Sequence, residues 1–270
     1  MVKVFLDSAK LDEIKRVKDF GILDGLTTNP SLIKKASEEF NGDIEAYIKE
    51  ILKTVKGPVS LEVIGTTYKE MVEEGEELFK KFNPIGKNVY IKIPVNPSLD
   101  EKDNNNFDGI EAIKTLSGKG IPVNCTLIFT PEQALLAAKA GAKFVSPFCG
   151  RIDDFIRKNN NVKFKKTDYY PAEGKSKNGS ILEDNGIVSG IDLVAQIREI
   201  FDNSGIKAEI LAASIRNTRM FREAALAGVD IITTPFETIE ELTKHTKTYE
   251  GMRNFTKDIV PEYKNLLESK

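Results

Sequence analysis

The sequence contains few of the residues on which several common chemistries depend. Tryptophan is absent, histidine occurs once and cysteine twice among 270 residues. Cys125 and Cys149 show no CxxC spacing and can form at most one bond, so we expect neither a disulfide framework nor a zinc site and predict two small buried side chains. The only histidine, His245, lies in a polar stretch and is predicted to be an exposed helix-end or loop residue. The chemistry must therefore run without a histidine base.

A strong charge of one sign and long hydrophobic runs are also missing. The formal net charge is -2 and acidic and basic residues are interspersed, so no field would collect nucleic acid or an anionic membrane, although a small phosphate pocket remains compatible. No run approaches the roughly 18 apolar residues of a membrane-spanning helix. Charged residues interrupt the N-terminal segment too early for the apolar run of a signal peptide. We therefore expect a cytoplasmic protein without nucleic-acid or membrane partners.

Short β-like runs alternate with helix-like segments, a pattern typical of βα units around a parallel sheet. The expected strands cover residues 2–7, 25–29, 59–64, 89–95, 123–129, 144–148, 208–215 and 231–234. The expected helices cover residues 11–19, 43–55, 68–82, 106–116, 131–140, 189–201, 218–227 and 238–244. Eight strands, each followed by a helix, favour an α/β fold: one closed (β/α)8 TIM barrel domain over residues 1–270, with an open doubly wound sheet as the alternative.

Two segments are additional to the eight βα units of a minimal barrel. Residues 153–186, after strand six, are polar and too long for an ordinary βα loop, which indicates a partly ordered lid or a flexible insertion. Residues 252–267 carry apolar side chains at helical spacing and predict a C-terminal helix that covers its own barrel or a neighbouring subunit.

Polar side chains gather at the carboxyl ends of the expected strands, where barrels of this kind hold their functional residues. They are Asp7, Thr27, Thr28, Asn29, Glu62, Lys92, Asn124, Thr126, Ser146, Arg151 just beyond strand six, Ser214 and Arg216. Seven strands would thus direct polar groups at one mouth.

Lys92 is the most distinctive of these residues, because it is one amine inside the apolar strand 89–95. Alternation directs it away from the face of Ile91 and Ile93, into the barrel. Burial disfavours the charged form of an amine, and a neutral amine is a nucleophile. A buried structural ion pair is the alternative interpretation. Lys3 also interrupts an apolar strand, but at the N-terminal end, where a barrel has its stability face.

Strand five, like the strand of Lys92, is expected to direct polar side chains into the barrel and apolar ones outward. Asn124 and Thr126 share one face, and Cys125 and Leu127 are expected on the other. Glu62 alternates likewise on strand three. It either neutralises a nearby lysine or, with Thr126 and a water, moves protons.

Arg151, Ser214 and Arg216 lie on loops expected to be adjacent. Guanidinium and hydroxyl groups in such a position form either an ordinary rim network or a clamp for a phosphate group.

Five phrases of the sequence together resemble the transaldolase family, in the family's order along the barrel. They are Leu6-Asp7-Ser8; Gly25-Leu26-Thr27-Thr28-Asn29-Pro30-Ser31; Val89-Tyr90-Ile91-Lys92-Ile93-Pro94; Val145-Ser146-Pro147-Phe148 with Arg151-Ile152-Asp153; and Ala212-Ala213-Ser214. The resemblance implies a Schiff-base mechanism of the pentose phosphate pathway that needs no metal or organic cofactor and acts on sugar phosphates.

The resemblance also implies a role for each catalytic residue. Lys92 would condense with the ketone of fructose 6-phosphate or sedoheptulose 7-phosphate. Asp7 would take a proton from the hydroxyl beside the breaking bond, which releases an aldose phosphate and leaves a dihydroxyacetone enamine on the lysine. Glu62 and Thr126 would hold the water that moves protons. Erythrose 4-phosphate or glyceraldehyde 3-phosphate would accept the three-carbon unit.

Substrate-binding roles follow in the same way. Asn29 and Asn124 would hydrogen-bond the ketol unit. The phosphate end would be bound by Ser146, Arg151, Ser214 and Arg216.

Other activities remain as alternatives. Fructose 6-phosphate aldolases resemble this chain but carry glutamine at the position of Glu62 and tyrosine at that of Phe148, so this sequence favours transfer over cleavage. A catalytically silent sugar-phosphate-binding barrel would be expected to lack Lys92 or Asp7, and an isomerase barrel would need a histidine or a carboxylate pair. Because compact members of the family form rings, we also expect a homo-oligomer.

Overall fold

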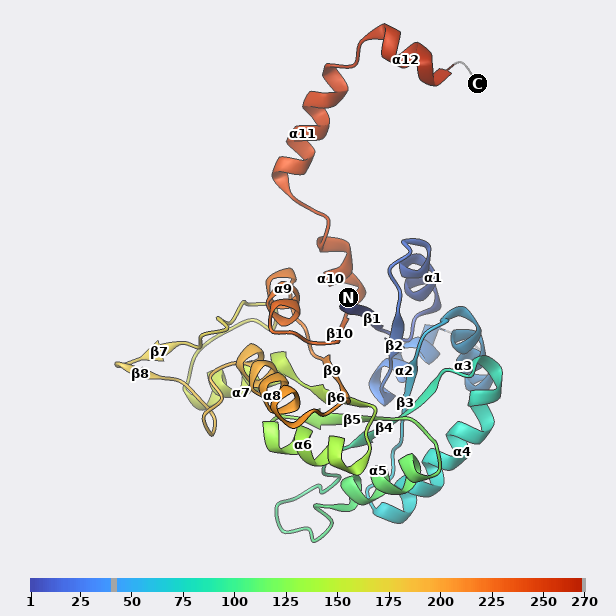
Figure 1. Cartoon of the computed structure of the whole chain (residues 1–270), viewed down its shortest axis with the longest axis vertical. Helices are drawn as coiled ribbons and strands as arrows, with labels where there is room; N and C mark the ends of the chain where they lie inside the picture. The colour runs from blue at the N-terminus through green and yellow to red at the C-terminus, as the bar shows by residue number, and fades with distance from the viewer. Residues whose placement is uncertain (40–42, 269–270) are drawn as a thin grey trace.

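The computed structural model describes residues 1–39 and 43–268. Within these residues eight parallel strands close into a barrel in the order β1-β10-β9-β6-β5-β4-β3-β2, and helices surround it (Figure 1). The closed parallel barrel with flanking helices confirms the (β/α)8 prediction, and the open sheet is excluded because β1 pairs with both β2 and β10.

The eight strands lie at the predicted positions. They are β1 Lys3–Asp7, β2 Gly25–Thr27, β3 Val59–Glu62, β4 Val89–Pro94, β5 Val123–Ile128, β6 Phe144–Pro147, β9 Glu209–Ala212 and β10 Ile231–Thr234. The helices are α1 Leu11–Asp19, α2 Pro30–Glu39, α3 Ile44–Thr54, α4 Tyr68–Gly86, α5 Asp108–Gly118, α6 Pro131–Ala140, α7 Cys149–Asn159, α8 Gly190–Ser204, α9 Thr218–Leu226, α10 Phe236–Glu241, α11 Thr246–Lys257 and α12 Pro261–Glu268. None of the helices in this described part is long and apolar enough to cross a membrane.

Alternation along the strands separates two apolar layers. Ile91 and Ile93 pack outward in the large core between strands and helices, as expected for residues that flank an inward Lys92. A smaller cluster around Phe5 and Phe144 fills the inside of the barrel, where the two rings meet edge to face at 6.1 Å. This filling restricts open space to the carboxyl ends of the strands.

An ion pair lies at the opposite end of the barrel. The Lys3 ammonium lies 2.6 Å from a carboxylate oxygen of Glu209, and both residues are at the N-terminal ends of their strands. The prediction that Lys3 belongs to the stability face is therefore confirmed.

One residue of strand five does not follow the predicted alternation. Cys125 packs in the outer core, but Leu127 packs against the cluster inside the barrel. The register of β5 against β6 shifts between Cys125 and Ile128, and Leu127 has a φ of 59°. This bulge turns Leu127 inward, so its predicted outward orientation was wrong.

Residues 153–186 are more ordered than a flexible insertion. The first seven of them complete α7, which buries Ile152 and Ile156, so the expected insertion begins later than Asp153. After α7, Ser176–Lys177 and Ser180–Ile181 form a small hairpin, β7 and β8, away from the barrel (Figure 1).

The C-terminal tail is divided into two helices. The predicted single helix is interrupted before Pro261, and α11 and α12 extend away from the barrel (Figure 1). Phe255 and Tyr263, two of the apolar residues at helical spacing, are 71% and 59% exposed. The tail therefore does not cover its own barrel.

Candidate functional site

A pocket of about 980 Å³ opens at the carboxyl ends of the strands. Eight of the predicted site residues line it: Asp7, Asn29, Lys92, Ser146, Phe148, Arg151, Ser214 and Arg216. The other three, Glu62, Asn124 and Thr126, lie behind this lining on β3 and β5. The structure thus brings the predicted residues, from seven strands and the segments that follow them, to one mouth.

The amino group of Lys92 reaches the pocket from the middle of β4. Its side chain is only 7% exposed, and Nζ lies 3.0 Å from Oε2 of Glu62 and donates to the backbone carbonyl of Thr28 at 3.3 Å. Glu62 stands directly beside Lys92 in the register of β3 and β4. The ion pair that was the alternative interpretation is therefore present, but the lysine also lines the pocket, where a substrate carbonyl can reach it.

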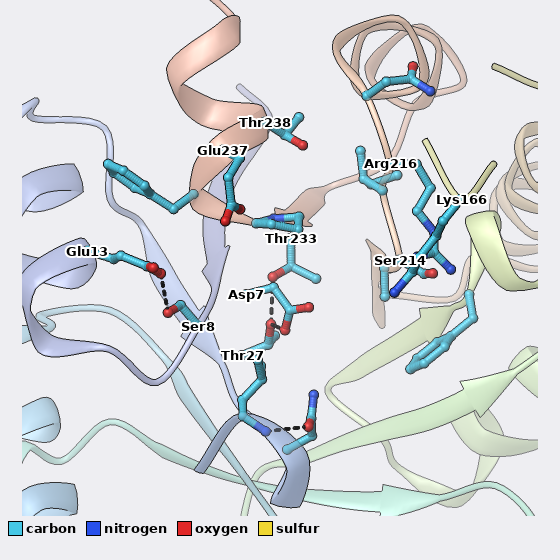
Figure 2. A pocket seen from close by; sticks show the side chains of 18 of the residues that line it. Asp7, Ser8, Glu13, Thr27, Lys166, Ser214, Arg216, Thr233, Glu237 and Thr238 are labelled. Carbon is cyan, nitrogen blue, oxygen red and sulfur yellow. Dashed lines mark hydrogen bonds between the residues drawn. The ribbon is translucent and has the colours of Figure 1, made fainter. Parts of the chain in front are cut away.

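Asp7 lies at the end of β1, and the hydroxyl of Thr27 lies between it and the hydroxyl of Thr233. Thr27 Oγ1 donates to Oδ1 of Asp7 at 2.8 Å and lies 2.6 Å from Oγ1 of Thr233 (Figure 2). Burial raises the pKa of the Asp7 carboxyl above its ordinary value, and the hydrogen bond from Thr27 and the positive charge of Lys92 act in the opposite direction. A carboxyl group in this balance is suited to accept and return a proton.

A polar network supports the floor of the pocket. Asn124 stands beside Lys92 in the register of β4 and β5, donates to Ser60 at 3.0 Å and accepts from Ser146 at 2.7 Å. Thr126 is fully buried, and its hydroxyl has no hydrogen-bond partner among the described residues. A buried hydroxyl costs free energy unless a ligand or water satisfies it, so Thr126 marks a position where either would be stabilised.

Two arginines and a serine form the far side of the pocket. Arg216 is paired with Asp154 of α7 at 3.2 Å, while its Nε has no hydrogen-bond partner among the described residues. The Arg151 guanidinium stacks over the ring of Phe148 at 4.8 Å. Ser214 has a φ of 60°, a conformation that is uncommon for residues other than glycine.

Phe148 also faces the lysine. Its ring lies 6.0 Å from Nζ of Lys92 and packs in the cluster inside the barrel. Position 148 therefore offers an aromatic face and no hydroxyl group to this part of the pocket.

The prediction assigned no role to several residues of the pocket wall, although it noted Thr27 at the end of a strand. Thr27 and Thr233 contact Asp7 or each other, Ser8 donates to Glu13 at 2.5 Å, and Lys166 comes from the insertion (Figure 2). Strand alternation predicts Thr233, since it shares the face of Ile231, which packs inside the barrel. Lys166 has no periodic signal, because its place depends on the path of an irregular loop.

Residues with other predicted roles lie where they were expected. Cys125 and Cys149 are buried and free, and His245 is exposed at the N-terminus of α11, where Nδ1 accepts from the backbone of Lys247 at 3.1 Å. In the described ranges, no three histidine, cysteine, aspartate or glutamate side chains are grouped so that they could hold a metal ion.

The closed barrel and the pocket at its carboxyl end define an α/β-barrel protein with a buried lysine, a carboxyl group and an arginine-rich wall in one site. Comparison with known proteins specifies the family. The family profile described as Transaldolase/Fructose-6-phosphate aldolase matches residues 4–269, and the chain belongs to this family of enzymes.

Three relatives have similarity over nearly their whole length. A protein of Leptospira biflexa is 42% identical over 257 residues, 95% of this chain and 97% of its own. One of Thermoplasma acidophilum is 42% identical over 271 residues, 98% of this chain and 100% of its own. One of Petrotoga mobilis is 40% identical over 269 residues, 100% of this chain and 99% of its own. Each is named "Probable transaldolase".

Proposed function

We propose that this protein is a transaldolase that transfers a dihydroxyacetone unit from sedoheptulose 7-phosphate or fructose 6-phosphate to glyceraldehyde 3-phosphate or erythrose 4-phosphate. This is the transaldolase step of the pentose phosphate pathway. The observation that carries the proposal is the buried amino group of Lys92 in the wall of the pocket, in a chain that belongs to the transaldolase family. The names of the relatives support the same activity.

The first chemical step is the condensation of Lys92 with the substrate ketone. The amine must first lose a proton, and the carboxylate of Glu62 at 3.0 Å is within hydrogen-bond distance. Attack on the carbonyl carbon forms a carbinolamine, which loses water to give an iminium ion. Glu62 and the hydroxyl of Thr126 hold the water through which protons enter and leave.

Asp7 acts in the second step. Its carboxylate removes the proton of the hydroxyl group next to the bond that breaks, and the carbon of that hydroxyl leaves as the aldehyde of an aldose phosphate. The electron pair of the broken bond moves toward the iminium ion and forms an enamine. The enamine then attacks the acceptor aldehyde, and the same steps in reverse release a different ketose phosphate from the lysine. The opposed effects of burial and of Thr27 and Lys92 on the pKa of Asp7 suit a group that takes up and returns the proton.

The remaining residues bind the substrate. Asn29 and Asn124 hydrogen-bond the hydroxyl groups of the ketol unit and slow its loss. Ser146, Arg151, Ser214 and Arg216 bind the phosphate end, where the guanidinium groups of Arg151 and Arg216 in the pocket wall support an anionic ligand.

Transfer is favoured over simple cleavage by the contacts of Phe148. The ring near Lys92 carries no hydroxyl group that would help a water to protonate the enamine or to attack the iminium ion that protonation forms. Fructose 6-phosphate aldolase activity is the second candidate, because the family description includes it.

We further propose that the chain acts in the cytoplasm, as one barrel domain and as a homo-oligomer. Phosphorylated sugars are charged and remain inside the cell. The exposed apolar residues of α11 and α12, together with the projection of these helices away from the barrel, support docking on a second copy.

Product analysis tests the activity. The protein is incubated with fructose 6-phosphate, with and without erythrose 4-phosphate. Sedoheptulose 7-phosphate that forms only with the acceptor supports transfer, whereas free dihydroxyacetone at a comparable rate without acceptor supports the aldolase.

Borohydride reduction during turnover tests the role of the lysine. Peptide mapping is expected to find the reduced adduct on Lys92 and none after Lys92→Met. Lys35→Met, a matched change of another lysine in the pocket wall, should leave the adduct unchanged. An adduct that survives Lys92→Met would refute the assignment.

A further inference from the structure

The segment between α7 and α8 brings a tight turn to the rim of the pocket. The turn runs from Lys165 to Asp168: the amide of Asp168 donates to the carbonyl of Lys165 at 2.9 Å, and a carboxylate oxygen of Asp168 accepts from the amide of Lys165 at 2.8 Å. Lys166 and Thr167, at the centre of the turn, both line the pocket. Lys165 does not.

The turn is attached to the protein on both sides. Arg157 of α7 is 2% exposed, donates to the carbonyl of Asp168 at 2.8 Å and lies against the ring of Tyr170 at 4.8 Å. From the other side, the amide group of Asn217 donates to the carbonyl of Thr167 at 3.4 Å. Asn217 directly follows Arg216, so the turn and the arginine are connected through adjacent residues.

Tyr169, the next residue, provides a further attachment. Its hydroxyl donates to Glu223 at 2.8 Å, and the guanidinium of Arg219 lies 3.7 Å from the centre of its ring. Both partners are on α9, the helix that follows Arg216. The backbone that carries Lys166 is thus held in place before any ligand binds, which reduces the entropic cost of binding.

The side chain of Lys166 is directed to the arginine side of the pocket. Figure 2 shows it in the same region as Arg216 and Ser214, across the pocket from Ser8 and Glu13. Lys166 is exposed, and none of the described residues forms a hydrogen bond or an ion pair with it. Its ammonium is free to bind a ligand.

A further cation would improve the balance between the positive charge on this side of the pocket and the negative charge of a phosphate group. A phosphate monoester carries a charge of about -1.5 to -2 at neutral pH. Arg151 and Arg216 line this side of the pocket, but Asp154 pairs with Arg216 at 3.2 Å and partly neutralises it. Lys166 restores the positive charge that a dianion needs.

We propose that Lys166 is an additional phosphate-binding residue of this pocket, which the insertion supplies beside Arg151, Ser214 and Arg216. The inference rests on the proposed function for the identity of the ligand, a phosphorylated sugar. It assigns to the insertion a part in selecting phosphorylated over unphosphorylated substrates.

Steady-state kinetics with Lys166→Ala test the inference. The KM for fructose 6-phosphate is expected to rise about fivefold to tenfold, as for the loss of one charge-assisted hydrogen bond at an exposed position, with kcat at saturation unchanged. Lys165→Ala, the neighbouring change outside the pocket, should leave KM unchanged, and Lys166→Arg should restore most of the affinity. Equal KM values for Lys166→Ala, Lys165→Ala and the unchanged protein would overturn the proposal.

A binding measurement separates this inference from the proposed activity. Inorganic phosphate is titrated into three proteins: the unchanged protein, Lys166→Ala and Lys165→Ala. Binding is followed by NMR, which requires no turnover. A lower phosphate affinity in Lys166→Ala alone supports the site even if no transaldolase activity is found. The same affinity in all three proteins, or no binding to the unchanged protein, contradicts it even if the enzyme is active.

Discussion

At the scale of single residues, the mouth of the barrel sets carboxyl groups close to cations. Glu62 pairs with Lys92, and Asp7 interacts electrostatically with Lys92, Arg151 and Arg216. The pKa of Asp7 is raised by burial and lowered by the Thr27 hydrogen bond and these three charges. The protonation of Asp7 thus depends on neighbours that can be changed one at a time.

Removal of the Thr27 hydroxyl should move the pH profile. Thr27→Val takes away the hydrogen bond that lowers the pKa of Asp7, so that pKa rises further. Because Asp7 must be ionised to accept a proton, the acid limb of kcat/KM should shift to higher pH. Thr238→Val, in another part of the same pocket, serves as the control. An acid limb that stays in place or moves to lower pH would contradict the role of Asp7.

Asp153 offers a prediction about stability. Its carboxyl group accepts from the amide of Gly190 at 2.7 Å, and burial raises its pKa from 3.8 to about 7. The folded state therefore binds a proton more tightly than the unfolded state, and the stability that this provides is present below about pH 4 and lost as pH rises toward about 7.

The Asp153→Asn variant keeps an acceptor for Gly190 but cannot ionise. Its unfolding free energy should increase relative to that of the unchanged protein between pH 4 and pH 7. Urea denaturation across this range measures the difference, and Asp12→Asn on the exposed face of α1 is the control. A difference that is constant with pH would show that Asp153 does not titrate in this window.

At the scale of elements, the N-terminus of α7 is fitted closely against the segment after β9. The amide of Gly150 donates to the carbonyl of Ser214 at 3.1 Å. A Cβ atom at Gly150 would overlap that carbonyl oxygen and the side chain of Arg216. Two of the proposed phosphate ligands are therefore positioned by the absence of a side chain.

Gly150→Ala should displace Ser214 and Arg216 together. A small displacement of a binding group can weaken its interaction with the substrate by a large factor. We therefore expect the KM for fructose 6-phosphate to rise about tenfold to a hundredfold. Gly118→Ala, where a Cβ meets open space in α5, should have little effect on KM. Unchanged kinetics in Gly150→Ala would mean that this contact does not position the site.

Two helices, α2 and α7, were absent from the predicted elements. Both α2 and α7 directly follow strands, and α7 was interpreted as the start of a polar insertion. Its helical form is stabilised by Ile152 and Ile156, which are buried against the barrel. Such a short helix depends on tertiary packing more than on its own propensity.

At the scale of the whole molecule, α11 and α12 form an arm that the barrel does not cover. No residue of α11 is buried, and Phe255 and Leu266 are 71% and 73% exposed. Isolated helices of this length are only marginally stable in water, so a partner surface is expected to stabilise the arm.

Deletion of residues 246–270 should therefore reduce the oligomeric mass and leave the barrel folded. Sedimentation of the full chain should give a multiple of 30.1 kDa, and the truncated chain a smaller assembly. Phe255→Ser is expected to weaken association without shortening the chain. A full-length mass of about 30 kDa would refute the homo-oligomer.

The sequence by itself determined the properties that depend on local periodicity. Alternation along each strand placed Lys92, Glu62 and Asn124 inside the barrel, because side chains of a strand point to opposite faces in turn. Eight βα repeats determined the barrel, and with it the end at which these side chains meet.

Only the tertiary structure decided which of these groups touch. The contact between Thr27 and Thr233 joins residues 206 positions apart and exists because the barrel closes. The bulge at Leu127 and the position of Lys166 depend on backbone conformations outside any regular repeat. Such contacts arise from the packing of distant segments, for which no local pattern of residues carries a signal.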